Sequence, residues 1–298
     1  MEPYLTLDIG GTKIDICLFD TEYNLLSRNI LKTADYQIRS MDFLDDIRSI
    51  ISLNLDTSNS RLGVSWNCYM NKGVIVWSSL LGGPANYPLE NELSKEFIIT
   101  VKVDDDIHAM TVAEHRFGKG QGSNYFVMLN IGTGIGGGYY ENGVVRGFAN
   151  MAGIYCYHPI YIEELGGEFA IDDIVSGRGI ELIYQRYAGT FKSTKQIFEA
   201  HTSDQSASMA IAIFAKYRAK HLVDLNFFYN PGVVIKSDHK FLPDAMELYY
   251  KEMDELGRGI HDPRISNLAS EQGVDWLGAI EEVKVSNLDY GACLGVVY

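Results

Sequence analysis

The feature that most constrains the fold is a pair of glycine-rich turns, each placed between two apolar segments. The first lies near the start of the chain, where Leu5–Ile9 and Ile14–Phe19 flank a Gly-Gly-Thr turn. Apolar, β-prone segments on both sides of a glycine turn predict a β-hairpin. The second turn, residues 132–138, again follows an apolar segment, Val127–Ile131, and precedes another. The fold is therefore expected to contain two similar hairpins that lie far apart in the sequence.

The first turn carries groups suited to binding a phosphate. Asp8 ends the first strand, Gly10 and Gly11 form the turn, and Thr12 and Lys13 follow. Because glycine has no Cβ, its backbone amide leaves room for an anion to approach. Thr12 adds a hydroxyl and Lys13 a cation at the same place. An ordinary hairpin has the same pattern, so this turn alone does not decide between the two interpretations.

The second turn repeats the design, with Gly132, Thr133, Gly134 and Gly136 between two strands. Two such hairpins separated by a helical half-domain are typical of the phosphate loops of the actin, Hsp70 and sugar-kinase architecture. With Asp106 between them, the two hairpins resemble those of the ROK family of bacterial sugar kinases and sugar-responsive repressors. The resemblance extends over nearly the whole chain and is most specific in its first half. It is similar to the zinc-free, β-glucoside-kinase-like branch.

The resemblance implies an α/β fold, the two-lobed actin-like ATPase fold, with a mixed sheet in each lobe and both hairpins facing one cleft. A length of 298 residues suits two lobes of ordinary size. We expect an N-terminal lobe over residues 1–118, with the first hairpin and the catalytic aspartate. The C-terminal lobe, 119–298, holds the second hairpin and the adenosine side, because Gly118–Ser123 has the composition of a flexible connector. Helices are expected over 41–55, 89–97, 107–114, 176–187, 207–228 and 241–256.

Composition limits the partners that this chain can bind. A net charge of −14 and a pI near 4.9 argue against nucleic acid and anionic membranes, because no basic surplus neutralises phosphates. A nucleotide site must then rely on local amides, Lys13 and a metal ion. The four cysteines are scattered singly, which indicates neither a disulfide framework nor a zinc cage. No signal peptide and no apolar run of about 20 residues is found, so we expect a cytoplasmic protein. We also expect a homodimer.

Three carboxylates end the strand that precedes residues 107–114. Asp104, Asp105 and Asp106 could simply cap the helix, where the helix dipole favours negative charge. The resemblance favours a catalytic interpretation, since family kinases carry Asn-Asp at this junction and Asp106 aligns with their catalytic base. A carboxylate there accepts the proton of a sugar hydroxyl as it attacks the γ-phosphate. Asp105 takes the place of the family asparagine near the sugar.

Other sugar-binding positions are expected from the same resemblance. Asn86 lies in the loop that faces the sugar in the family, although an asparagine of an ordinary turn is an equally good interpretation. Glucokinase-type members carry a glutamate and a zinc-binding histidine where this chain has Ile154 and Tyr157. Tyrosine also occurs there in zinc-free β-glucoside kinases. Ala170 stands where a zinc-loop cysteine is expected, so no zinc site is expected here. Asp172 either keeps a carboxylate near the sugar or caps a helix.

The adenosine side is expected after the segment Asn230–Ile235. In the family this strand ends in three glycines, whereas here Lys236, Ser237 and Asp238 follow. Side chains then occupy positions where bare backbone approaches the nucleotide, and the charge of Lys236 could compensate. Residues 273–279 match the family's closing strand-to-helix turn. The final residues carry no pattern that predicts a structure.

The expected function is ATP-dependent phosphorylation of a sugar hydroxyl. Asp8 and the two glycine turns place Mg²⁺ and the phosphates of ATP, and Asp106 orients the acceptor. The alternative is a catalytically impaired relative that binds a sugar or a nucleotide, because several family motifs are changed. A DNA-binding repressor is disfavoured, since such proteins carry an upstream helix-turn-helix domain and only seven residues precede Asp8.

Overall fold

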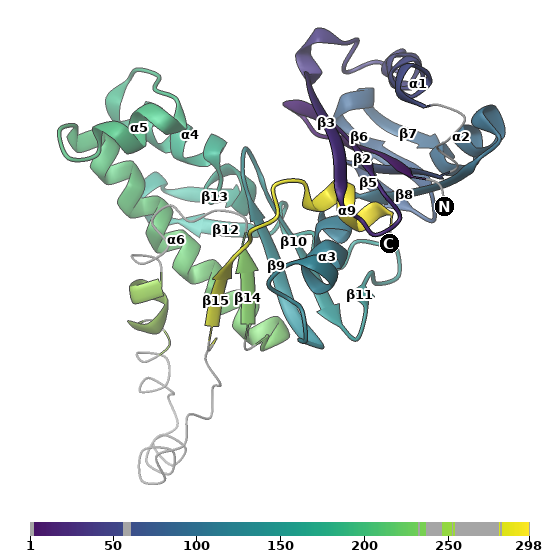
Figure 1. Cartoon of the computed structure of the whole chain (residues 1–298). Helices are drawn as coiled ribbons and strands as arrows, with labels where there is room; N and C mark the ends of the chain where they lie inside the picture. Colours follow the sequence, from purple (N-terminus) through teal and green to yellow (C-terminus); the bar gives the residue numbers. More distant parts are fainter. Residues whose placement is uncertain are drawn as a thin grey trace. The chain divides into compact units, whose positions relative to one another are not determined.

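The computed structural model describes residues 3–55, 61–231, 233–236, 246–251, 253, 280 and 282–297. The chain divides into two compact units (Figure 1). Unit 1 comprises Met1–Asn124, Gly138–Gly153 and Asn287–Tyr298, and unit 2 comprises Tyr125–Gly137 and Ile154–Ser286. This division differs from the two consecutive segments expected from the sequence, because the chain enters unit 1 three times.

Unit 1 is built on a five-stranded mixed sheet with the order β3-β2-β1-β4-β8. Strand β1 pairs antiparallel with β2 and parallel with β4, and β8 continues the parallel part. A separate three-stranded sheet has the order β5-β6-β7. The strands are β1 (Tyr4–Ile9), β2 (Lys13–Phe19), β3 (Leu25–Lys32), β4 (Arg61–Trp66), β5 (Tyr69–Asn71), β6 (Val74–Ser78), β7 (Gly83–Tyr87) and β8 (Thr100–Asp105). The helices are α1 (Phe43–Asn54), α2 (Leu89–Phe97), α3 (Asp106–Phe117) and α9 (Gly291–Val296).

Successive side chains along β1 and β2 point to opposite faces of the first sheet, so its two faces have different contacts. Leu5, Leu7 and Ile9 point into a core that includes the buried faces of α1 and α2. Tyr4, together with Cys17 and Phe19 of β2, joins a second cluster with α3 and α9. Helices therefore cover both faces. Asp8, which shares the parity of Tyr4, belongs to the α3/α9 face.

Helix α9 packs closely against α3 and the sheet (Figure 1). A Cβ atom added to Gly295 would collide with the backbone of Ala109 in α3. One added to Gly63 of β4 would lie 2.7 Å from a methyl carbon of Val296. Small residues at these positions let α9 approach the layer that carries Asp8 and the start of α3.

The second five-stranded sheet repeats the topology of the first. Its order is β11-β10-β9-β14-β15, with β14 parallel to β9 and β15 and with β10 antiparallel to β11. In both sheets the first strand in sequence is central and a glycine turn joins it to the second. The strands are β9 (Tyr125–Ile131), β10 (Ile135–Glu141), β11 (Val144–Val145), β14 (Val233–Lys236) and β15 (Glu282–Val285), and β12 (Pro159–Ile162) pairs separately with β13 (Gly167–Ala170). The helices of unit 2 are α4 (Gly177–Ala188), α5 (Thr194–Ala200) and α6 (Gln205–Tyr229).

Some expectations fall on residues outside this description. Ser237, Asp238 and the closing turn at 273–279 lie there, as does most of the helix expected over 241–256. Residues 246–251 and 253 of that segment are helical. Within the described ranges, no helix is long and apolar enough to cross a membrane.

Candidate active site

Asp8 occupies the carboxyl end of β1. One carboxylate oxygen accepts a hydrogen bond of 2.9 Å from the hydroxyl of Ser65, its neighbour on β4 and the last residue but one of that strand. Burial raises the pKa of Asp8 to about 6, and the bond from Ser65 and the charge of Lys13 oppose this increase. The carboxyl ends of parallel strands are where α/β sheets collect ligands. Asp8 is therefore a half-buried carboxylate at the edge of the sheet where ligands are expected.

Asp106 is the first residue of α3, directly after β8. Its Oδ2 atom accepts a hydrogen bond of 3.0 Å from the amide of Asn67, and its Oδ1 accepts one of 3.0 Å from the backbone of Ile107. The pKa of Asp106 is raised to about 7, mainly by burial. The nearby carboxylates of Asp8 and Asp105 contribute to this increase, and the hydrogen bonds from Asn67 and Ile107 oppose it. A carboxyl with a pKa near neutrality has the property that a general base needs.

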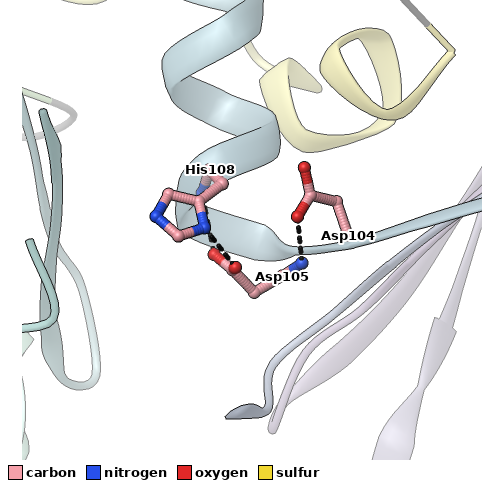
Figure 2. Close-up of side chains that lie close together, drawn as sticks. All are labelled: Asp104, Asp105 and His108. Atoms are coloured by element: carbon pink, nitrogen blue, oxygen red, sulfur yellow. Dashed lines mark hydrogen bonds and ion pairs between the residues drawn. The ribbon is translucent and has the colours of Figure 1, made fainter. Parts of the chain in front are cut away.

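Asp105 has a different environment from Asp106. It is the N-cap of α3: its Oδ1 accepts a bond of 2.8 Å from the backbone of His108. Its Oδ2 lies 2.5 Å from Nδ1 of His108 (Figure 2). The same oxygen accepts a hydrogen bond of 3.1 Å from the amide of Asn150. The capping interpretation thus describes Asp105, whose two oxygens already accept bonds within unit 1. Its expected contact with a sugar stays a prediction.

Asp104 joins the same network through an arginine. Both of its oxygens accept hydrogen bonds from the guanidinium of Arg146, at 2.7 and 2.5 Å. Burial lowers the pKa of His108, but the hydrogen bond to Asp105 and the negative charges of Asp105 and Asp104 together outweigh this effect, and the net shift is upward. Arg146 and His108 thus bind two neighbouring carboxylates. Ligand atoms of Asp104, Asp105 and His108 lie within 4.8 Å of one another, a spacing that could hold a metal ion (Figure 2). The positive charge at Asp104 is, however, already supplied by Arg146. The expected lack of zinc stays a prediction.

The first hairpin is open on one side. The amide of Gly10 donates to the carbonyl of Lys13 at 2.9 Å, which closes the turn. A Cβ atom added to Gly11 would meet nothing within 4 Å, and Thr12 is exposed. The ammonium of Lys13 pairs with Asp15 at 3.0 Å. The buried carboxylate of Asp15 also binds Arg28, so Lys13 is one of two cations that share it.

The second hairpin has the same opening and a firmer support. Its turn is closed by the bond from Gly132 N to Gly134 O, at 2.8 Å, and a Cβ added to Gly132 would again meet nothing within 4 Å. Thr133 is exposed and Gly136 lies in the following strand. Asp172 accepts a bond of 2.6 Å from the amide of Ile135. This carboxylate fills the space beside Gly134, where an added Cβ would lie 2.6 Å from it.

The remaining expected residues lie in several different environments. Asn86 is exposed, with a φ of 47°, a conformation that an asparagine of an ordinary turn also tolerates. Tyr157 is exposed in unit 2. The side chain of Lys236 is buried in β14. These positions do not test the roles expected for the three residues, which stay predictions.

Two residues that contact the site did not stand out in the sequence. Asn67 directly follows β4 and donates a hydrogen bond to Asp106, and Ser65, the last residue but one of β4, donates to Asp8. One feature of the sequence could have indicated both residues: Arg61–Ser65 was expected to be a buried strand. Since the ends of neighbouring parallel strands meet at one edge of a sheet, polar residues just after that strand were candidates.

The family profile with the description ROK family matches residues 4–246. The chain belongs to the ROK family. As a ROK member it is 25% identical over 251 residues to an N-acetyl-D-glucosamine kinase of Haemophilus influenzae, which covers 78% of this chain and 82% of that relative. It is 31% identical over 156 residues to a beta-glucoside kinase of Listeria monocytogenes, over 50% and 51% of the two chains.

Solved ROK structures share the fold. A ROK glucokinase from Streptomyces griseus, determined with glucose and AMPPNP, superposes with a TM-score of 0.72 at 20% identity and covers 99% of this chain and 97% of that one. The actin-like ATPase fold expected from the paired hairpins is thereby confirmed.

Proposed function

We propose that this ROK protein is an ATP-dependent sugar kinase that transfers the γ-phosphate of ATP to a hydroxyl of a monosaccharide or glucoside. A carbohydrate kinase is what the named relatives have in common, because they phosphorylate N-acetylglucosamine, β-glucosides or glucose. The observation that carries the proposal is Asp106, a carboxyl with a pKa of about 7 at the start of α3, directly after the edge strand β8. It lies close enough to Asp8 for the two charges to interact.

In this proposal Asp106 accepts the proton of the attacking hydroxyl. Phosphoryl transfer demands mainly positioning and electrostatic stabilisation from the protein. Asn67 holds one oxygen of Asp106 and Ile107 holds the other, so the carboxylate keeps one orientation. A pKa of about 7 leaves about half of the molecules ionised at neutral pH, which suits a base that must accept and then release a proton.

The glycine turns supply the phosphate contacts. Gly11 and Gly132 face open space, so an anion can approach their backbones. Asp8 fits a hard divalent cation such as Mg²⁺, because only one of its oxygens accepts the bond from Ser65. Asp8 would hold that ion through the nucleotide, and the ion would neutralise phosphate charge. A nearby cation would also lower the pKa of Asp8, which burial raises.

The experiment is an assay of ADP release with N-acetylglucosamine, N-acetylmannosamine, glucose and a series of β-glucosides. The proposal expects turnover with at least one of these sugars that requires Mg²⁺ and leaves a phosphorylated sugar detectable by mass spectrometry. Wild-type protein that binds a sugar but releases no ADP above the sugar-free control would replace the proposal by the binding-protein alternative. This alternative is supported by Ile154 and Tyr157, which replace the glutamate and histidine of glucokinase-type members.

A further inference from the structure

The second glycine hairpin rests on the start of helix α4. The backbone amides of Gly177 and Arg178 donate to the carbonyls of Gly132 and Thr133, at 2.8 and 3.2 Å. A Cβ added to Gly177 would lie 2.9 Å from the Gly132 carbonyl oxygen, so only glycine permits this approach. The first turn of α4 therefore places the Cα atom of Arg178 beside the exposed tip of the hairpin.

The side chain of Arg178 is anchored to the same hairpin. Its Nη2 atom forms an ion pair with Oδ2 of Asp172, while Oδ1 of Asp172 accepts from the amide of Ile135. One carboxylate thus links the guanidinium to the backbone of the turn. The side chain of Arg178 is still 58% exposed. Within the described residues its other N–H groups have no hydrogen-bond partner, so they remain available to a ligand.

The two hairpins differ in the cation that they offer. In the first, Lys13 and Arg28 share the buried carboxylate of Asp15. Burial raises the pKa of Asp15, but its bonds to the two cations outweigh this effect and the net pKa lies below the ordinary value. In the second, Arg178 carries a guanidinium with several unused donors. A planar guanidinium can bind two phosphate oxygens at once, which an ammonium cannot. A chain with a net charge of −14 needs such a local cation to hold a nucleotide.

We propose that Arg178 binds the phosphates of the nucleotide at the Gly132–Gly134 turn, and that Asp172 is the positioning residue that holds its guanidinium there. This rests on the proposed kinase function and assigns the phosphate-binding cation of that site. It also gives Asp172 a role on the nucleotide side, in place of the contact with sugar expected from the sequence. The oxygens of Asp172 bond Ile135 and Arg178, and its backbone carbonyl accepts from Ser176.

The test measures ATP, adenosine and sugar affinities of the whole protein by calorimetry, with steady-state kinetics for any active sugar. Arg178→Gln keeps a hydrogen bond to Asp172 but removes the charge. We expect it to weaken ATP binding about 10- to 100-fold, the size of losing hydrogen bonds to a charged group, and to leave adenosine and sugar affinity unchanged. Arg178→Lys should recover part of the loss. Arg186→Ala, at the exposed end of the same helix, is the matched control and should bind ATP normally.

Asp172→Asn separates the two roles considered for this residue. It keeps an acceptor for the amide of Ile135 and removes the charge that anchors Arg178. We expect weaker ATP binding, by less than the loss in Arg178→Gln, and unchanged sugar affinity. Arg178→Gln with wild-type ATP affinity, or with equal losses for ATP and adenosine, would overturn the assignment of Arg178. A loss confined to sugar in Asp172→Asn would overturn the positioning role.

These outcomes are separable from those of the kinase proposal. If wild-type protein binds ATP but phosphorylates no sugar, the kinase proposal fails while the affinities of the Arg178 variants still decide this inference. If wild-type protein binds adenosine and ATP equally, the phosphates contribute nothing and the assignment of Arg178 is wrong. Thermal unfolding of each variant at one pH checks that the fold is retained.

Discussion

Replacing Asp106 by asparagine should lower activity and raise stability. The amide keeps the shape of the side chain but cannot accept a proton from the sugar. General-base contributions are about 10²–10⁴-fold, so kcat of Asp106→Asn should fall by that factor, with KM for the sugar little changed. In wild type, the pKa of Asp106 of about 7 should appear as the acidic limb of the kcat/KM profile, with a fall of about tenfold per pH unit below it.

The gain in stability follows from the same pKa. The fold raises the pKa of Asp106 from its ordinary value of 3.8 to about 7. At about 1.4 kcal/mol per pH unit, this difference corresponds to at most about 4 kcal/mol. The folded protein binds this proton more tightly than the unfolded chain does. The carboxyl therefore costs nothing below about pH 4, and its cost grows as the pH rises to about 7 and then stays constant.

Urea unfolding at pH 4.5 and pH 8 measures this effect. Asp106→Asn should be more stable than wild type by about 1–4 kcal/mol at pH 8 and by much less at pH 4.5. Asp35→Asn, which removes an exposed carboxylate, is the control and should change neither stability nor kcat. A wild-type kcat in Asp106→Asn would show that the base is another group. A stability difference independent of pH would show that the pKa of Asp106 is not raised by the fold.

Three further substitutions test other contacts. Asn67→Ala removes the hydrogen bond that lowers the pKa of Asp106, so the acidic limb of kcat/KM should move to higher pH; an unchanged limb would separate Asn67 from the base. Asp105→Asn keeps the helix cap but removes the negative partner of His108. Urea unfolding at pH 7 should show a free energy of unfolding that is lower by about 1–3 kcal/mol. A variant as stable as wild type would mean that His108 is neutral. Gly295→Ala places a Cβ atom against the backbone of Ala109 and should lower the free energy of unfolding by about 1–3 kcal/mol in the same assay. The control is Gly291→Ala, whose Cβ would have ordinary contacts from 3.6 Å and should change stability little. Equal effects of the two substitutions would argue against the close approach of α9.

The sequence was most informative where local chemistry decides local structure. Glycine turns between β-prone segments predicted both hairpins, and the helix expected over 89–97 matches α2 (Leu89–Phe97). The capping role of Asp105 could also be predicted, because a carboxylate before a helix bonds the backbone amide three residues later. The raised pKa of Asp106 depends on the burial of its carboxyl in the folded chain, which could not be predicted from the sequence.

Contacts between distant segments were the part that could not be predicted. Nothing near Asn67 indicates that its amide meets Asp106, because the two residues come together only when β4 and β8 pair. The contact of Asp172 with the second hairpin likewise depends on how the chain folds between residues 138 and 172. The tail was missed for a different reason: Gly291–Val296 is short and rich in small residues, so it lacks the apolar spacing that predicts a helix.

The return of the tail to unit 1 has a consequence for synthesis on the ribosome. The strands of the first sheet are complete once β8 has emerged, yet α9, which covers one face of that sheet, begins at Gly291. About 190 residues separate the two events, which is roughly 10–40 s of translation. During that interval the apolar side chains that later meet α9, with Phe19 and Ala113 among them, have no tail to cover them. A nascent chain of this protein therefore offers chaperones a binding surface that the finished protein has buried.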